Sequence, residues 1–127
     1  MRYLKELKKI KLPRNQYAIF GSGPLAIRNI RKSKDIDIIV KKKLWNKLIK
    51  KYKVRNGKIK IGNVEIFKDW LGFKNVNKLI ADVDIFKNIR FVKLKYVISW
   101  KKKRNKEKDK RDIKLINKYI KNKKMIN

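Results

Sequence analysis

The stretch Phe20–Val40, "FGSGPLAIRNIRKSKDIDIIV", decides the fold, because it joins a glycine-serine turn to an apolar run that contains two aspartates. Side chains two residues apart in a strand point to the same face, so Asp35 and Asp37 are expected to project together. Two neighbouring carboxylates repel each other, and each raises the pKa of the other unless a cation lies between them. The pair therefore predicts a divalent metal site on a strand.

The turn at residues 21–23 is expected to lead into a helix. Pro24 suits the first turn of a helix, because its missing N–H would be unpaired there in any case, and the helix is expected to continue to about Arg31. The free N–H groups at a helix N-terminus form a binding site for phosphate. A phosphate site beside paired carboxylates is what metal-assisted phosphoryl or nucleotidyl transfer requires.

The flanking sequence predicts an α/β (α+β) fold, with a short, mixed, twisted sheet flanked by helices. We expect strands at 16–20, 35–40, two short stretches within 53–67, 84–86 and 89–92. We expect helices at 2–11, 24–31, 44–52, 75–82, 93–104 and 110–122, with frayed residues after them. A single domain over residues 1–127 is expected, with a core at about 13–92 and C-terminal helices at about 93–122. The tryptophans are expected to pack in the core, base stacking by Trp70 being the alternative; they are Trp45, Trp70 and Trp100.

The composition restricts the available chemistry. The chain has 127 residues, a formal net charge of +30, and neither cysteine nor histidine. Disulfides, cysteine-based metal sites and a histidine general base are thereby excluded, which leaves carboxylate and metal chemistry. No apolar run is long enough for a membrane span and no secretory signal is present, so we expect a soluble, cytoplasmic protein.

The positive charge has two explanations that the sequence leaves open. A basic surface attracts nucleic acid, nucleoside triphosphates or anionic lipid. Alternatively, lysine is abundant because it can be encoded by A alone, which an A/T-rich genome favours, and in that case the lysines should be scattered over all faces. The scarcity of acidic residues is not explained by this codon bias, because their codons are also rich in A and T.

The order of motifs resembles a known family. Gly21-Ser22, a helical spacer and then Asp35-Ile36-Asp37 within a strand are similar to the signature of the DNA polymerase β-like nucleotidyltransferase superfamily, particularly its small stand-alone members. The resemblance covers roughly residues 17–67, and the C-terminal helices more loosely.

This resemblance implies a site that binds two Mg²⁺ ions, with Mn²⁺ as an alternative. Asp35 and Asp37 would be metal ligands, and Gly21 and Ser22 would contact the triphosphate. The third carboxylate best matches Glu65 in "NVEIF", although the family more usually has aspartate there. Because the chain lacks histidine, either Glu65 or a metal-bound hydroxide would deprotonate the attacking group.

The C-terminal segment "KEKDKRDIKLI", residues 106–116, is similar to the Lys-Asp pattern with which several small members of the superfamily end. Lys101, Arg104 and Lys108 are therefore candidates for contacting the triphosphate, and Asp109 for orienting the site. The alternative is a solvated, lysine-rich start of a helix. A second pair of aspartates, Asp82 and Asp84, has the same spacing without a preceding glycine-serine turn, and we interpret it as a helix end and a strand start.

The resemblance implies transfer of a nucleoside monophosphate from a nucleoside triphosphate, with ATP as the expected nucleotide, to an acceptor hydroxyl, with release of pyrophosphate. The acceptor is unidentified; tRNA or another polyanion is favoured, and a homodimer or a partner subunit would complete the pocket. The alternative function is a catalytically inactive basic module that binds RNA or DNA. Intact paired carboxylates argue against that alternative, because a site that has lost its catalytic function has no physical need for them.

Overall fold

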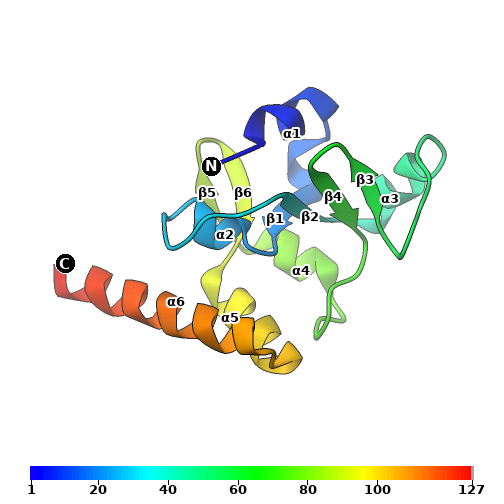
Figure 1. The fold of residues 1–127 in the computed structure, drawn as a ribbon. Helices are drawn as coiled ribbons and strands as arrows, with labels where there is room; N and C mark the ends of the chain where they lie inside the picture. Colours follow the sequence, from blue (N-terminus) through cyan, green and yellow to red (C-terminus); the bar gives the residue numbers. More distant parts are fainter. Residues whose placement is uncertain (127) are drawn as a thin grey trace.

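The computed structural model describes residues 1–126, which form one six-stranded mixed sheet with helices on both faces (Figure 1). The strand order is β3-β4-β2-β1-β6-β5, with parallel pairing of β2 with β4 and of β1 with β6, and antiparallel pairing elsewhere. The strands are β1 (Tyr17–Phe20), β2 (Ile36–Val40), β3 (Ile59–Ile61), β4 (Val64–Phe67), β5 (Val83–Phe86) and β6 (Ile89–Val92). This architecture confirms the predicted fold class.

The helices follow the expected order. They are α1 (Leu4–Ile10), α2 (Gly23–Ala26), α3 (Lys42–Leu48), α4 (Val76–Ala81), α5 (Leu94–Arg104) and α6 (Glu107–Ile126), with a short 3₁₀ helix at Arg14–Gln16. In Figure 1 the long helix α6 lies below the sheet beside α5, and α1 lies on the opposite side of the molecule.

Strand alternation divides the interior into two apolar clusters. Ile19, Ile38 and Ile66 point to one face of the sheet, where Leu7 of α1 and Trp45 of α3 cover them. The other face carries the second cluster, to which α4, α5 and α6 contribute; its buried members include Phe20, Ile39, Leu79, Val92, Val97, Trp100 and Ile116. Because side chains alternate along a strand, the odd-numbered residues of β2 and β4 lie on this second face.

The three tryptophans are buried, as the sequence predicts. Trp70 stacks on Phe20 with a ring separation of 4.3 Å, and it makes edge contacts with Phe67 and Trp100, each at 5.1 Å. Base stacking by Trp70 is therefore not available in this arrangement, because its faces are occupied within the core.

Several helix boundaries differ from the prediction, among them those of α3, which covers Lys42–Leu48 instead of 44–52. The helix that begins near Pro24 ends at Ala26 instead of about Arg31, because Asn29 adopts a left-handed conformation (φ 58°) and the Ile30 N–H bonds to the Leu25 carbonyl. Such a left-handed residue with a six-to-one hydrogen bond ends helices. At the C-terminus, α6 begins three residues earlier than expected.

The early start of α6 has a local cause. The Asp109 carboxylate accepts a hydrogen bond from the Lys106 N–H, a capping contact that satisfies a free donor at the helix start. The predicted fraying near the C-terminus is wrong for the residues up to Ile126, because α6 continues to that residue. Asn127 lies outside the described residues.

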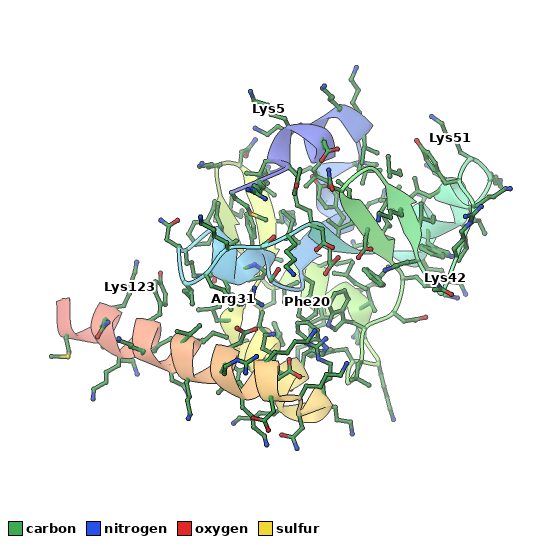
Figure 2. The ribbon with its side chains drawn as sticks, viewed as in Figure 1. Lys5, Phe20, Arg31, Lys42, Lys51 and Lys123 are labelled. Atoms are coloured by element: carbon green, nitrogen blue, oxygen red, sulfur yellow. The ribbon has the colours of Figure 1, made fainter. Side chains whose placement is uncertain are left out.

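Lysines project around the outline of the molecule in the view of Figure 2. Figure 2 shows Lys5 on α1, Lys42 and Lys51 at the α3 end, and Lys123 near the end of α6. This spread is what the codon-composition alternative predicts, so the total charge does not by itself define a nucleic-acid interface. Among residues 1–126, no helix is both long enough and apolar enough to cross a bilayer.

Candidate active site

Three carboxylates meet on the second face of the sheet. Asp37 of β2 lies directly opposite Glu65 of β4 in the parallel register, and Asp35 immediately precedes β2. One oxygen from each of the three side chains lies within 4.8 Å of the other two. Within residues 1–126 this is the one group of three potential metal-ligating side chains so arranged. Glu65 therefore lies on the same face of the sheet as Asp37 and close to Asp35.

Backbone contacts fix the position of Asp35. The N–H of Ile36 bonds to the carbonyl of Asn63, which aligns the start of β2 with the turn before β4. The buried hydroxyl of Ser33 donates a hydrogen bond to the Asp35 carbonyl. Asp35 is therefore held by main-chain contacts while its carboxylate faces the other two.

The triad is electrostatically strained. Burial, followed by the contact with Glu65 and the charge of Asp35, raises the pKa of Asp37 to about 8. Burial and the charge of Glu65 also raise the pKa of Asp35. Oδ1 of Asp37 is buried and has no hydrogen-bond partner in the described part of the chain. A buried acceptor without a partner is costly, so this atom is suited to a ligand.

Within residues 1–126, Lys58 is the one side chain that forms an ion pair with the triad. Its Nζ lies 2.8 Å from Oε1 of Glu65. Burial acts to raise the pKa of Glu65, but the hydrogen bond from Lys58 and the contact with Asp37 outweigh it, so this pKa lies below its usual value. Glu65 is therefore held as an anion, while Asp35 and Asp37 carry the unfavourable repulsion.

Gly21 packs against the triad. Its φ of 60° favours glycine, and a Cβ at this position would lie 2.5 Å from Oδ2 of Asp37. The turn can approach the carboxylate closely only because residue 21 has no side chain. Ser22 is the next residue of the turn, and its side chain makes no capping contact with α2.

The expected phosphate site at a long helix N-terminus is not formed. Helix α2 contains four residues, which is too short for a substantial dipole. Any phosphate contact by Gly21 and Ser22 would therefore use the turn itself.

A cleft of about 540 Å³ opens over Asp35 and Asp37, between the segment at 31–35 and helices α5 and α6, and Glu65 is not among its lining residues. Lys108 lies on its wall as predicted, together with Lys101 and Arg104. The cleft thus brings together every predicted phosphate-binding residue and both aspartates. Its lining residues are Gly21, Ser22, Arg31, Lys32, Lys34, Asp35, Asp37, Trp100, Lys101, Arg104, Lys108, Arg111, Asp112 and Leu115.

Two of the predicted phosphate contacts are already paired. Lys101 is 1% exposed, and its Nζ lies 2.8 Å from Asp112 and 3.5 Å from Asp109. Arg104 donates two hydrogen bonds to Asp109, at 2.6 and 2.9 Å. These two cations hold α5 against α6, so their charge is used within the fold.

Other basic residues at the cleft were missed by the sequence analysis. Arg31 pairs with Asp112 through two hydrogen bonds of 2.7 and 2.8 Å, and Figure 2 shows it between the α2 region and α6. Lys32, Lys34 and Arg111 also line the cleft. The signal was present in the "RKSK" run directly before Asp35 and in the three-residue spacing from Lys108, which places residue 111 on the same side of a helix.

The second aspartate pair does not form a comparable site. Asp82 is paired with Lys93 at 2.6 Å and with Lys95, and it accepts a hydrogen bond from Tyr96. Asp84 pairs with Arg28 at 2.7 Å. Both carboxylates have cationic partners, which is consistent with their interpretation as structural residues.

The triad fits a hard divalent cation. Carboxylate oxygens are the ligands that Mg²⁺ and Mn²⁺ prefer, and the unpartnered Asp37 Oδ1 offers one directly. Asp35, Asp37 and Glu65 are the residues that could hold it. Comparisons of the chain with protein-family models, with curated proteins and with solved structures find no match.

Proposed function

We propose that this protein is a metal-dependent nucleotidyltransferase, which transfers a nucleoside monophosphate from a nucleoside triphosphate, ATP first, to an acceptor hydroxyl. One observation carries the proposal: one carboxylate oxygen from each of Asp35, Asp37 and Glu65 lies within 4.8 Å of the other two, and the two aspartates line a cleft whose walls are basic. A fold without such chemistry gains nothing from three converging carboxylates, since their repulsion destabilises it.

The carboxylates would hold Mg²⁺, as two ions, or Mn²⁺ in its place. Bound there, the metal would neutralise the triad and stabilise charge on the reacting phosphate. Lys58 keeps Glu65 ionised and so ready to act as a ligand. Gly21 lets the turn approach Asp37, which restricts the orientation of that carboxylate.

The triphosphate would be held by the cations of the cleft that have no ion pair within residues 1–126. Lys108 and Arg111 lie on α6, and Lys32 and Lys34 lie on the opposite wall. Ser22 contributes a hydroxyl that does not cap α2. Charged groups from two walls would orient the phosphates by charge-assisted hydrogen bonds.

The test is nucleotide transfer combined with metal binding. Wild-type protein, Asp35→Asn and the matched control Asp69→Asn are incubated with Mg²⁺, each α-labelled nucleoside triphosphate, and total cellular RNA or protein. Asp69 is exposed and lies outside the triad, so its substitution removes the same charge without touching the site. We expect label transfer by the wild type and the control, and none by Asp35→Asn.

Mn²⁺ binding, measured by electron paramagnetic resonance, gives a second readout. It should be lost in Asp35→Asn and retained in Asp69→Asn. Activity of Asp35→Asn at the wild-type level, or equal Mn²⁺ binding by both variants, would contradict the proposal. Because the reaction consumes nucleoside triphosphates, we propose a cytoplasmic location. Completion of the pocket by a homodimer or a partner subunit stays a prediction.

A further inference from the structure

A second hollow adjoins the active cleft. It has a volume of about 800 Å³ and lies between the N-terminal residues and the segment that follows α2. Its polar lining consists of Arg2, Asn29, Arg31, Lys32, Ser33 and Lys34. A hollow of this size is in the range of ligand-binding sites in proteins.

Residues 31–34 form the partition between the two hollows, which are the cleft over Asp35 and Asp37 and the second hollow. Arg31, Lys32 and Lys34 line both of them, whereas Asp35 and Asp37 line the cleft alone. The hydroxyl of Ser33 donates to the Asp35 carbonyl, so the partition is joined directly to the metal-binding triad. A ligand that occupied both hollows would therefore cross the partition next to the carboxylates.

The second hollow is suited to anions. Four cationic side chains line it, of which Arg31 is paired with Asp112, and no acidic side chain is among the described residues of its lining. Arg2 and Asn29 are exposed and do not line the cleft, and Arg2 has no ion pair recorded in residues 1–126. Asn29 adopts the left-handed conformation that ends α2. Unpaired donors facing a basic hollow are what a phosphate group requires.

We propose that the acceptor is a single-stranded polynucleotide whose terminal nucleotide lies in the cleft and whose preceding phosphates lie in the second hollow. This inference rests on the proposed function. A small acceptor confined to the second hollow would not reach Asp35 or Asp37, because neither residue lines it. A phosphodiester strand carries charges at regular intervals, so it can occupy both hollows at once.

In the proposed reaction the terminal hydroxyl oxygen of the strand bonds to the α-phosphorus of the nucleoside triphosphate. The bond from that phosphorus to the oxygen bridging to the β-phosphate breaks, and pyrophosphate leaves with the electron pair. The hydroxyl proton passes to solvent. The second hollow takes no part in these bond changes and acts by positioning the strand.

The experiment measures binding of a fluorescein-labelled, single-stranded RNA oligonucleotide, long enough to span both hollows, by anisotropy at several salt concentrations. The variants are Arg2→Gln, the charge-retaining Arg2→Lys, and the control Lys51→Gln on the far side of the molecule (Figure 2). Each phosphate contact to a single strand contributes about 0.7 to the log–log salt slope. We expect Arg2→Gln to reduce the slope by about 0.7, and Arg2→Lys and Lys51→Gln to preserve it.

Two outcomes would overturn the inference. In the first, Lys51→Gln lowers the affinity and the slope as much as Arg2→Gln does, which would mean diffuse binding to a basic surface. In the second, the wild type does not bind the oligonucleotide at low salt and transfers the nucleotide to protein or to a small hydroxyl compound, so the proposed function stands without this acceptor. Conversely, Arg2-dependent binding without any nucleotide transfer would contradict the proposed function and not the strand site.

Discussion

The protein contains two clusters of carboxylates near the same cleft, and they differ in how many cations surround them. Asp109 and Asp112 are buried, but three cations surround them: Lys101, Arg104 and Arg31. The triad of Asp35, Asp37 and Glu65 has one cation, Lys58, on one of its three members.

The pKa shifts express this difference. At Asp109 burial acts to raise the pKa, but the hydrogen bonds from Arg104 and from the Lys106 N–H outweigh it and hold the pKa below its usual range. At Asp37 the charge of Lys58 offsets only part of the effect of burial and of the neighbouring carboxylates, and the pKa rises to about 8. A buried acidic pair that is satisfied within the fold is structural, whereas one left unsatisfied indicates a place for a ligand.

The same substitution, aspartate to asparagine, should have different results in the two clusters, and the largest effect is expected in the triad. Asp37→Asn removes a metal ligand and should lower the rate of nucleotide transfer by a factor of about 10³ or more, as expected for the loss of several kcal/mol of transition-state stabilisation. In the absence of metal it should also be more stable than the wild type, because the repulsion within the triad decreases. Label transfer and urea denaturation check the two effects; a less stable variant with normal activity would reverse the assignment.

Asp109→Asn is expected to do the opposite. It leaves the buried Lys101 and the partly buried Arg104 without their shared anion, which should lower the free energy of unfolding by about 3 kcal/mol. Transfer activity per folded molecule should change far less than in Asp37→Asn. Denaturation midpoints together with activity normalised to the folded fraction test this, and full stability of the variant would show that the cluster does not hold α5 to α6.

The pH dependence should also differ between the clusters. The pKa of Asp37 rises on folding from 3.8 to about 8, so its contribution to stability is complete below pH 4 and is lost as the pH rises toward 8. The pKa of Asp109 is lowered on folding, so its contribution is present above pH 4 and is lost in acid. Metal-free wild type should therefore lose stability between pH 4 and pH 8, on the order of 5 kcal/mol.

Two controls isolate the Asp37 contribution. Asp37→Asn should show a much smaller decline over the same pH range, and Mg²⁺ should restore the stability of the wild type at pH 8. Thermal or urea denaturation with and without chelator is the measurement. Parallel declines in the wild type and in Asp37→Asn would assign the effect to other groups.

The smallest expected effect concerns Lys58. Its ammonium group competes with a metal ion for the negative charge of Glu65, but it is partly solvated, so the contribution is modest. Lys58→Met should tighten Mn²⁺ binding by a factor of about 2 to 5, corresponding to less than about 1 kcal/mol. Weaker Mn²⁺ binding in Lys58→Met would instead mean that Lys58 positions Glu65 for the metal. Lys51→Met, which changes a lysine on the far side of the molecule from the triad, is the control.

Much of the site could be predicted from local sequence. The two-residue spacing of Asp35 and Asp37 fixes their common face in any strand, and Gly21 marks a turn that requires positive φ. Glu65 could be predicted only as one acidic residue on one strand. Its place opposite Asp37 depends on the parallel pairing of β2 with β4, which joins segments separated by helix α3 and strand β3.

The sequence by itself determined the alternation of the strands, the pairing of Asp35 with Asp37, and the absence of histidine and cysteine chemistry, since these follow from residue identity and from a period of two. Tertiary structure decided which charges are free. Lys101 and Arg104 are paired because α6 packs on α5 and brings Asp109 and Asp112 to them, and Arg31 joins them from a distant loop. A charged side chain acquires its role from the groups that folding brings within about 4 Å, and for these residues chain order does not contain that information.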